Sequence, residues 1–265
     1  MAFYERTVNG VPLLCSSLIS ARHGFTTRYG GVSRGQWASL NLGENRGDDP
    51  DCVRENYRRA AAAIGFELGK LVFTRQVHGR CVRYASPADS RELYTPIEYT
   101  CDGLYTDIKE LPILCFTADC VPVLLYDPVC GAAAAVHCGW RSTVQDILGE
   151  AVTRMQELGA APENIRCAIG PAIGACCFEV GTDVVQAMEN WLGSAAGQFV
   201  REKPGVPGKY LADLRGADAY RLRELGLSPE HIDVSNACTM CQPEKYWSHR
   251  VTRGQRGSQA AFIVL

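Results

Sequence analysis

Apolar residues recur along parts of this chain with the period of an α-helix, which places them on one face. Asp49 followed by Pro50 marks a helix start, because the carboxylate can cap free N–H groups and proline suits the first turn. Gly65 suits the end of this helix. The apolar face expected between them consists of Val53, Tyr57, Ala61 and Ile64.

A second helical period follows Gly139 and ends near Gly159. Its apolar positions are Val144, Ile147, Leu148, Val152, Met155 and Leu158. Further helices are expected over 182–192 and 210–225. Together with the strands described next, these helices would alternate with extended segments along most of the chain.

Extended segments are indicated by alternating or continuous apolar runs. Residues 71–84 alternate, PILCFTADCVPVLLYDP contains two strand-like runs on either side of 117–119, and GAAAAVHC, IRCAIG, HIDVS and AAFIVL read as buried strands. Because strands alternate with helices but hairpin-like pairs also occur, we predict an α/β (α+β mixed) fold of mixed β-sheets packed against flanking helices. We predict one domain over residues 1–265 and leave the strand order open.

Composition narrows the classes of partner and compartment. A formal net charge of -2 does not favour nucleic acid or an anionic membrane surface. The N-terminal segment shows no secretory pattern, and no apolar run reaches the ~18 residues of a membrane span. The 13 cysteines lie mostly in apolar stretches, where a free thiol behaves as a small hydrophobe. We therefore predict a cytoplasmic protein, as a monomer or small homo-oligomer, that acts on small molecules.

Three short segments carry the candidate chemistry: QVHG with His78, TADCVP with Cys120, and HCGWRS with His137. Two histidines and one cysteine can form a zinc site that keeps its fourth position open for water or substrate. Taken alone, each residue is more commonly an interior histidine or a core cysteine, but three such residues at similar strand ends favour a shared site. The CxxC pair Cys238–Cys241 has no second CxxC to complete a metal site, so we predict an incidental placement.

Two arginines are candidates for binding an anion. Arg141 would lie in the first turn of the helix after His137, where free N–H groups point outward. Arg28 precedes a Gly-Gly turn, which lets backbone approach a ligand closely. The alternative for both is a solvated side chain. The polar, basic segment YWSHRVTRGQRGSQ could border a substrate or simply connect two apolar elements.

A series of segments in fixed order extends from Gly24 to Arg250: GFTTRYGGVS, SLNLG, GDDPDCVRENYRR, QVHG, DGLYTD, TADCVPVLLYD, HCGWRS, GPAIGACCFEVG, ACT and YWSHR. The series resembles the YfiH-like laccase-domain family, whose members are described as purine nucleoside phosphorylases and formerly as polyphenol oxidases. The resemblance implies that His78, Cys120 and His137 bind zinc, with copper as the alternative metal. It implies phosphorolysis of adenosine, inosine and methylthioadenosine, and deamination of adenosine.

The same resemblance adds Asn41 of SLNLG and Arg250 of WSHR to Arg28 and Arg141 as candidates for binding nucleoside and phosphate. Some positions depart from the family pattern, which leaves the substrate preference open; they are Cys138, Ser142, His249 and the segment 257–259. None of these departures removes a metal ligand.

A zinc ion held by the three ligands would lower the pKa of a bound water to about 7. Deamination also needs a group that moves protons, and Asp119 beside Cys120 is our candidate, with orientation of the ligand loop as its alternative role. Cys120 with a histidine could instead form the nucleophile–base pair of a zinc-independent cysteine hydrolase acting on a small metabolite or cell-wall precursor. A copper-dependent polyphenol oxidase is a further alternative, although five histidines are few for several coppers.

Overall fold

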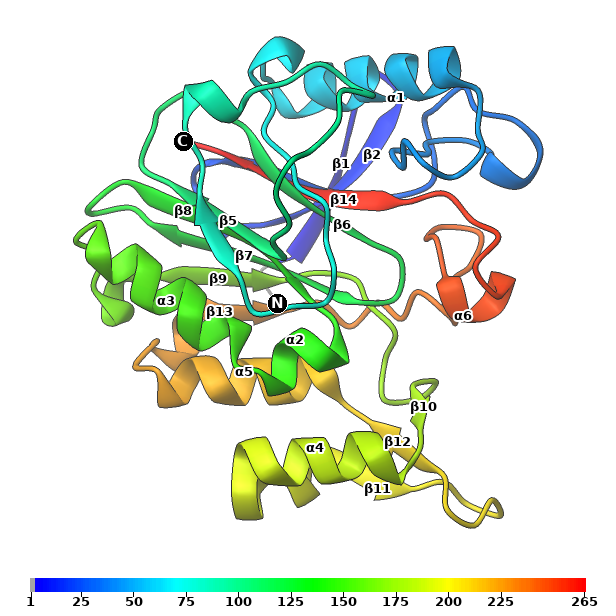
Figure 1. Ribbon diagram of the computed structural model, residues 1–265, viewed down its shortest axis with the longest axis vertical. Coiled ribbons are helices and arrows are strands. Elements are labelled where there is room, and N and C mark those ends of the chain that lie inside the picture. Colours follow the sequence, from blue (N-terminus) through cyan, green and yellow to red (C-terminus); the bar gives the residue numbers. More distant parts are fainter. Residues whose placement is uncertain (1–2) are drawn as a thin grey trace.

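The computed structural model describes residues 3–265, in which two large β-sheets pack face to face (Figure 1). The first sheet is antiparallel throughout, in the order β1 (Phe3–Val8), β2 (Val11–Ser16), β3 (Arg22–Thr26), β14 (Gln259–Val264) and β6 (Ile113–Thr117). The second sheet has the order β13 (Ile232–Val234), β9 (Arg166–Ile169), β7 (Val121–Asp127), β8 (Ala132–Cys138), β5 (Gly103–Thr106) and β4 (Val82–Tyr84). It is mixed, because β13 with β9 and β4 with β5 are parallel while the central pairs are antiparallel.

The central strands read as continuous apolar runs because both of their faces are buried. In β8, one face packs against helices and consists of Ala132, Ala134, Val136 and Cys138. Its other face, with Ala133 and Ala135, packs in the layer between the two sheets. In β14, Ala261 and Ile263 face that same layer, and Phe262 faces the opposite side. The small side chains of β8 let the strand lie close to β6 on one face and a helix on the other.

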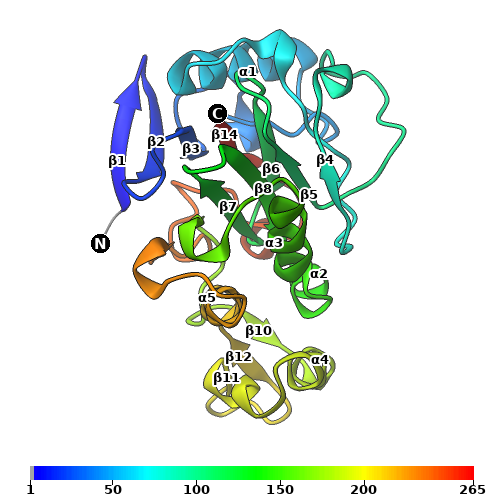
Figure 2. The same cartoon turned by 90° about the vertical axis from the view of Figure 1, so that its left-hand side faces the viewer.

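Helices cover both outer faces of the paired sheets (Figure 2). The helix α1 (Pro50–Ile64) packs on the first sheet, and α2 (Trp140–Val144), α3 (Ile147–Glu157) and α5 (Leu214–Glu224) pack on the second. The helix α4 (Thr182–Leu192) and a small antiparallel sheet of β10 (Glu179–Val180), β12 (Tyr210–Ala212) and β11 (Val200–Glu202) extend away from the layers (Figure 1). The short α6 (His249–Thr252) precedes β14, and short 3-10 turns occupy 35–37, 68–70, 87–89, 162–164, 193–198 and 229–231.

The predicted fold class is confirmed, and several of its elements are confirmed as well. The Asp49 carboxylate caps α1 by accepting a hydrogen bond from the Asp51 N–H at 2.9 Å, and Gly65 ends the helix with a φ of 95°. The two runs around 117–119 are β6 and β7, and they belong to different sheets. The segment 182–192 is a helix over the predicted range.

Three elements differ from their predictions. Residues 71–84 form isolated bridges and only the short β4 at their end, because Val72 and Arg75 each pair at a single position. The helix after Gly139 is divided into α2 and α3 by Asp146, whose φ of 63° is left-handed. The predicted helix over 210–225 begins only at residue 214, since its first residues form β12.

Among residues 3–265, no helix combines the length and the apolar character needed to cross a bilayer.

Candidate metal centre and adjoining cavity

Strand pairing in the second sheet brings the three predicted metal ligands to one end of it. His137 lies near the end of β8, and β7, which pairs with it antiparallel, begins directly after Cys120. The first residue of β5 pairs with Val136, and β4 runs parallel to β5, so the loop that precedes β4 and carries His78 reaches the same end. His78 and Cys120 are 42 residues apart in the chain, and only this register makes them neighbours.

The ligand atoms of His78, Cys120 and His137 all lie within 4.8 Å of one another. The Cys120 Sγ is 3.7 Å from the His78 Nε2, and the two imidazole rings are 4.8 Å apart between centroids at an angle of 80°. Ligands of a tetrahedral zinc ion, at about 2.0–2.3 Å from the metal, are separated by about 3.5 Å. Small movements of the side chains therefore suffice for the three residues to hold a zinc ion with one position open.

Asp102, directly before β5, orients two of the three ligands. Its carboxylate lies 2.8 Å from the His137 Nδ1, and it accepts the backbone N–H groups of Val77, His78 and Gly79 at 3.0, 2.8 and 2.9 Å. Burial would raise the pKa of Asp102, but these hydrogen bonds, first of all that from His137, hold it below its ordinary value. Because Nδ1 faces the carboxylate, the His137 Nε2 is left for a metal, as metal-bound histidines usually require.

Two further residues allow the His78 loop to approach the other ligands. A Cβ atom at Gly139 would lie 2.5 Å from the His78 Cδ2, so only glycine leaves room for the His78 ring. The Gln76 side chain pairs with the backbone of Phe116 in β6, accepting its N–H at 2.6 Å and donating to its carbonyl at 2.9 Å. The loop is thereby attached to β6 as well as to Asp102.

The ligand side chains also shift one another's pKa values. Burial alone would raise the pKa of Cys120, but the neighbouring His137 and His78 rings lower it to about 6. Burial alone would lower the pKa of His137, but Cys120 and Asp102 raise it to about 9. Cys120 is therefore a thiolate at neutral pH, which is the form that binds metal and the form that attacks electrophiles.

All three ligands line a cavity of about 650 Å³. Its wall includes the aromatic side chains of Phe73, Tyr94 and Phe116, of which Phe73 and Phe116 meet edge to face at 6.0 Å. The Tyr94 hydroxyl is buried and has no hydrogen-bond partner among the described residues. Glu44 is the one carboxylate among the described residues of the wall, and burial raises its pKa although the Tyr94 N–H donates to it at 2.6 Å. The cavity thus combines apolar surface with a small number of polar groups, as ligand sites commonly do.

Three arginines, Arg46, Arg75 and Arg256, also line this cavity. Within residues 3–265, none of the three forms a salt bridge, and the buried Nε of Arg256 has no hydrogen-bond partner. Burial and the nearby Arg46 lower the pKa of Arg256 to about 10, so it stays charged at neutral pH. Clustered cations without carboxylate partners favour an anionic ligand.

The four residues predicted to bind nucleoside and phosphate lie outside the described wall of the cavity. The Arg28 guanidinium donates to the carbonyls of Ala38 and Pro243 and lies 4.1 Å above the Trp247 ring. Arg141 is exposed and stacks on Trp140 at 4.2 Å. Their binding roles stay predictions, and the contacts seen here are structural.

The other two of the four act on neighbouring backbone. Asn41 is buried, and its Oδ1 accepts the N–H groups of Gly43 and Ser258 at 2.8 and 2.9 Å, both of which line the cavity. Asn41 therefore shapes the wall from behind. The Arg250 side chain donates to the Glu179 carbonyl at 3.1 Å, which places it beside the small sheet.

Asp119, the predicted proton-transfer residue, is buried beside Cys120 with a φ of 88°. Its carboxylate accepts the Thr239 hydroxyl at 2.6 Å and the Arg250 N–H at 2.7 Å. Both carboxylate oxygens are thus occupied by the C-terminal segment. These contacts match the alternative role of orienting the ligand loop.

Sequence reasoning did not assign roles to Asp102, Arg46, Arg75 or Arg256. Asp102 opens DGLYTD, one of the segments that carried the family resemblance, and this was a signal for it. Arg75 stands three residues before His78, in TRQVHG. Arg256 lies in the basic segment 246–259 that could border a substrate, but nothing local singled it out there. Arg46 carried no such signal, because nothing local distinguishes it from a solvated arginine in a polar loop.

Comparison with known proteins agrees with the motifs. The family model described as multi-copper polyphenol oxidoreductase laccase matches residues 22–265. Purine nucleoside phosphorylase YlmD of Geobacillus stearothermophilus is 39% identical over 246 residues, covering 91% of this chain and 88% of that protein. A purine nucleoside phosphorylase of Deinococcus radiodurans is 38% identical over 259 residues, covering 98% and 95%. The crystal structure of the hypothetical protein YfiH of Bacillus licheniformis has a TM-score of 0.90 at 31% identity, covering 98% of both chains. The chain therefore belongs to the laccase-domain family of that model, as its motifs indicated.

Proposed function

We propose that this chain is a zinc-dependent purine nucleoside phosphorylase, which transfers the ribosyl group of adenosine, inosine or methylthioadenosine to phosphate. The observation that carries the proposal is the cavity in which the candidate metal ligands, three arginines and aromatic side chains meet. Its volume of about 650 Å³ suits a small ligand, since such pockets usually enclose about 300–1,000 Å³. Relatives named purine nucleoside phosphorylases, at 38% and 39% identity, support the same activity.

The cavity offers a suitable surface for each of the two substrates, the purine nucleoside and phosphate. The aromatic side chains offer an apolar wall for a purine. Arg46, Arg75 and Arg256 offer the positive charge that an oxyanion such as phosphate requires. Asn41 holds two backbone segments of the wall in place from behind.

Phosphorolysis forms a bond from a phosphate oxygen to C1′ of the ribose and breaks the bond from C1′ to the purine nitrogen. The departing purine carries the electron pair and takes up a proton. Glu44 is the candidate donor, because burial raises its pKa and it lines the cavity. When bound at His78, Cys120 and His137, zinc would supply a Lewis acid with one open position. The arginines would hold the attacking phosphate, so that its charge is offset where the new bond forms.

We extend the proposal to deamination of adenosine at the same site, in which water replaces the amino group at C6 and ammonia leaves. Glu44 lines the same cavity as the candidate ligands, which supports a proton-transfer role for this carboxylate. Asp119 would then orient the Cys120 loop through Thr239 and Arg250.

Thirteen free cysteines in the described chain also support a reducing, cytoplasmic location.

A zinc-independent cysteine hydrolase is favoured by one observation. The Cys120 thiolate lies 3.7 Å from the His78 Nε2, and its pKa is lowered to about 6. However, Asp102 presents both histidines toward the thiol, and two imidazoles around one thiolate suit a metal better than a nucleophile–base pair. A copper oxidase is less well supported, because only two of the five histidines lie at this site.

The proposal is tested by incubating the purified protein with adenosine, inosine and methylthioadenosine, with and without phosphate, and identifying the products by chromatography. Phosphate-dependent release of the free base and a pentose 1-phosphate is expected, together with phosphate-independent inosine from adenosine. Prior treatment with a chelator should abolish both, and zinc should restore them. Full turnover in zinc-free protein that is lost after alkylation of Cys120 would favour the hydrolase instead.

The position of the phosphate is tested by Arg256→Ala and Arg75→Ala. Each should raise KM for phosphate by about tenfold or more, because a hydrogen-bonded ion pair contributes about 1.5–3 kcal/mol. Arg201→Ala is the matched control, since Arg201 is exposed on β11 of the small sheet and should leave KM unchanged. Unchanged phosphate kinetics in both cavity variants would contradict this placement.

A further inference from the structure

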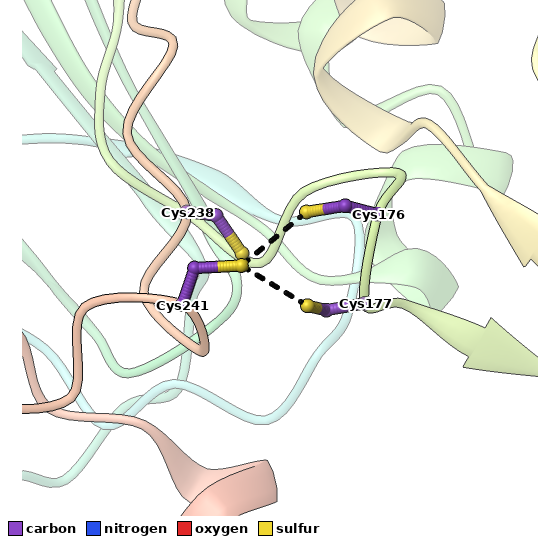
Figure 3. A group of neighbouring side chains, drawn as sticks. All are labelled: Cys176, Cys177, Cys238 and Cys241. Carbon is purple, nitrogen blue, oxygen red and sulfur yellow. Dashed lines mark hydrogen bonds between the residues drawn. The ribbon is translucent and has the colours of Figure 1, made fainter.

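Four cysteines gather at the same end of the second sheet, outside the cavity (Figure 3). The strands β9 and β13 are parallel neighbours, so the loops that follow them emerge at one end of the sheet. The loop after β9 carries Cys176 and Cys177, and the loop after β13 carries Cys238 and Cys241. The sequence predicted an incidental placement for the CxxC pair because no second CxxC is present, but the structure brings a CC pair more than 60 residues away beside it.

The four thiols are close enough to bind one metal ion. All four Sγ atoms lie within 4.8 Å of one another, with the Cys241 Sγ at 3.3 Å from that of Cys177 and 3.6 Å from that of Cys176. Four thiolates at about 2.3 Å from a tetrahedral zinc ion are about 3.8 Å apart. Figure 3 shows the two pairs of side chains pointing toward each other from facing loops.

The surroundings of the thiols suit a negatively charged cluster. The Gly174 N–H donates to the Cys238 Sγ at 3.2 Å, a contact that favours a thiolate. A Cβ atom at Gly174 would lie 2.9 Å from the Arg215 Nη2 and 3.3 Å from the Cys176 Sγ, so the guanidinium is next to the cluster and glycine gives it room. Arg215 is buried and is held by the carbonyls of Ser235 and Ala237. A cation fixed at this place would offset part of the charge of four thiolates.

The same two loops contact the residue beside the candidate catalytic ligand. The Ile173 N–H donates to the Asp119 carbonyl at 2.9 Å, and the Thr239 hydroxyl donates to the Asp119 carboxylate. Thr239 lies between Cys238 and Cys241. An ion that joins the two loops would therefore also hold the backbone at Asp119, directly before Cys120.

We propose that Cys176, Cys177, Cys238 and Cys241 form a second, structural zinc site, separate from the His78, Cys120 and His137 centre. Four sulfur ligands in a tetrahedral arrangement select zinc or iron, and a closed set of four cysteines is a usual form of a structural zinc site. All four thiols are free, which metal coordination by four thiolates requires. The site depends on its own residues and does not require the proposed activity.

Metal analysis of the purified protein tests the proposal. Protein produced with ample zinc should contain two zinc ions per chain. A Cys120→Ala variant should retain one of them, and a Cys176→Ser, Cys241→Ser double variant should retain the other. Cobalt substituted into Cys120→Ala should give the absorption of tetrahedral thiolate coordination, because only the four-cysteine site remains. Cys52→Ser, a change in α1 that is remote from both sets of ligands, is the control and should keep both ions.

Alkylation of the unaltered protein gives a second readout, in case the double variant does not fold. In zinc-replete protein, iodoacetamide should modify the exposed Cys81 while Cys176 and Cys241, which are also exposed, stay unmodified. Removing zinc with a chelator should expose both to reaction. Three outcomes would each overturn the proposal. The first is rapid alkylation of Cys176 and Cys241 in zinc-replete protein, and the second is a single zinc ion that is lost in Cys120→Ala. The third is a disulfide between Cys177 and Cys241 in protein kept reduced.

Discussion

Asp102→Asn is the sharpest perturbation of the candidate metal centre, because one carboxylate supports two of the three ligands. Its two oxygens serve the N–H groups of Val77, His78 and Gly79 and face the Nδ1 of His137. An asparagine retains one oxygen, so two of the four donors lose an acceptor and meet an NH₂ group instead. At about 1–3 kcal/mol for each buried unsatisfied group, the free energy of unfolding should fall by about 2–6 kcal/mol.

The metal affinity should fall as well, because the His78 loop and the His137 ring lose their orientation. Removing a partner behind a metal ligand typically weakens binding by about 10–100-fold. Competition with a chromophoric chelator measures the affinity, and comparison with Cys120→Ala assigns it to this centre. Urea unfolding of the zinc-free protein measures the stability separately.

Asp127→Asn is the matched control for this experiment. Asp127 is fully buried and accepts the N–H groups of Val129, Cys130 and Ala161 at 2.7, 3.2 and 3.1 Å. The change should reduce stability by a comparable mechanism while zinc affinity at the centre stays unchanged. An Asp102→Asn variant that binds zinc as tightly as the unaltered protein would refute the proposed role of the carboxylate.

Three further predictions follow from the contacts of single residues. Iodoacetamide should alkylate Cys120 of chelator-treated protein with a pH midpoint near 6, since the thiolate forms above its lowered pKa; a midpoint near the ordinary value of 9.0 would contradict this. Gly139→Ala should weaken zinc binding, because the added Cβ would lie 2.5 Å from the His78 ring; calorimetric titration measures the loss, and unchanged affinity would refute the steric argument. Asp146→Asn, which keeps a residue type that tolerates the left-handed φ of 63°, should lower stability by about 1–3 kcal/mol at neutral pH, because it replaces the carboxylate that accepts two hydrogen bonds from Arg221 at 2.7 and 2.8 Å. Burial would raise the pKa of Asp146 but Arg221 lowers it, so this difference should shrink as pH falls through the lowered pKa; a difference that persists at acid pH in urea unfolding would contradict the assignment.

The elements that the sequence predicted well are those with a local physical cause. The helix α1 has its own cap, its proline and its glycine end, so its limits were readable without knowledge of the fold. The segment 210–225 was less well predicted, because its first residues pair with β10 and β11, and this pairing overrides local helical preference. Asp146 likewise interrupts a helical pattern through a partner in α5 that is 75 residues away.

The residues of the candidate site likewise divide into those that the sequence predicted and those that it did not. His78, Cys120 and His137 were predicted because their residue types have few roles in buried surroundings, and the family-like segments reinforced them. The cavity arginines were not predicted, because an arginine in a polar loop has the same local pattern whether it faces solvent or a cavity. Arg28 and Arg141 had more suggestive neighbours, but their side chains stack on Trp247 and Trp140.

The sequence by itself determined most of the strands and helices and which side chains can bind metal, since periodicity and residue chemistry are local properties. Only the tertiary structure decided which of these side chains meet. Cys120 lies beside His137 because β7 pairs with β8, and Cys176 lies beside Cys241 because the parallel strands β9 and β13 release their loops at one end of the sheet. Strand order depends on packing across both faces of the sheet. When a strand is buried on both faces, its apolar sequence does not indicate which strands or helices pack against it.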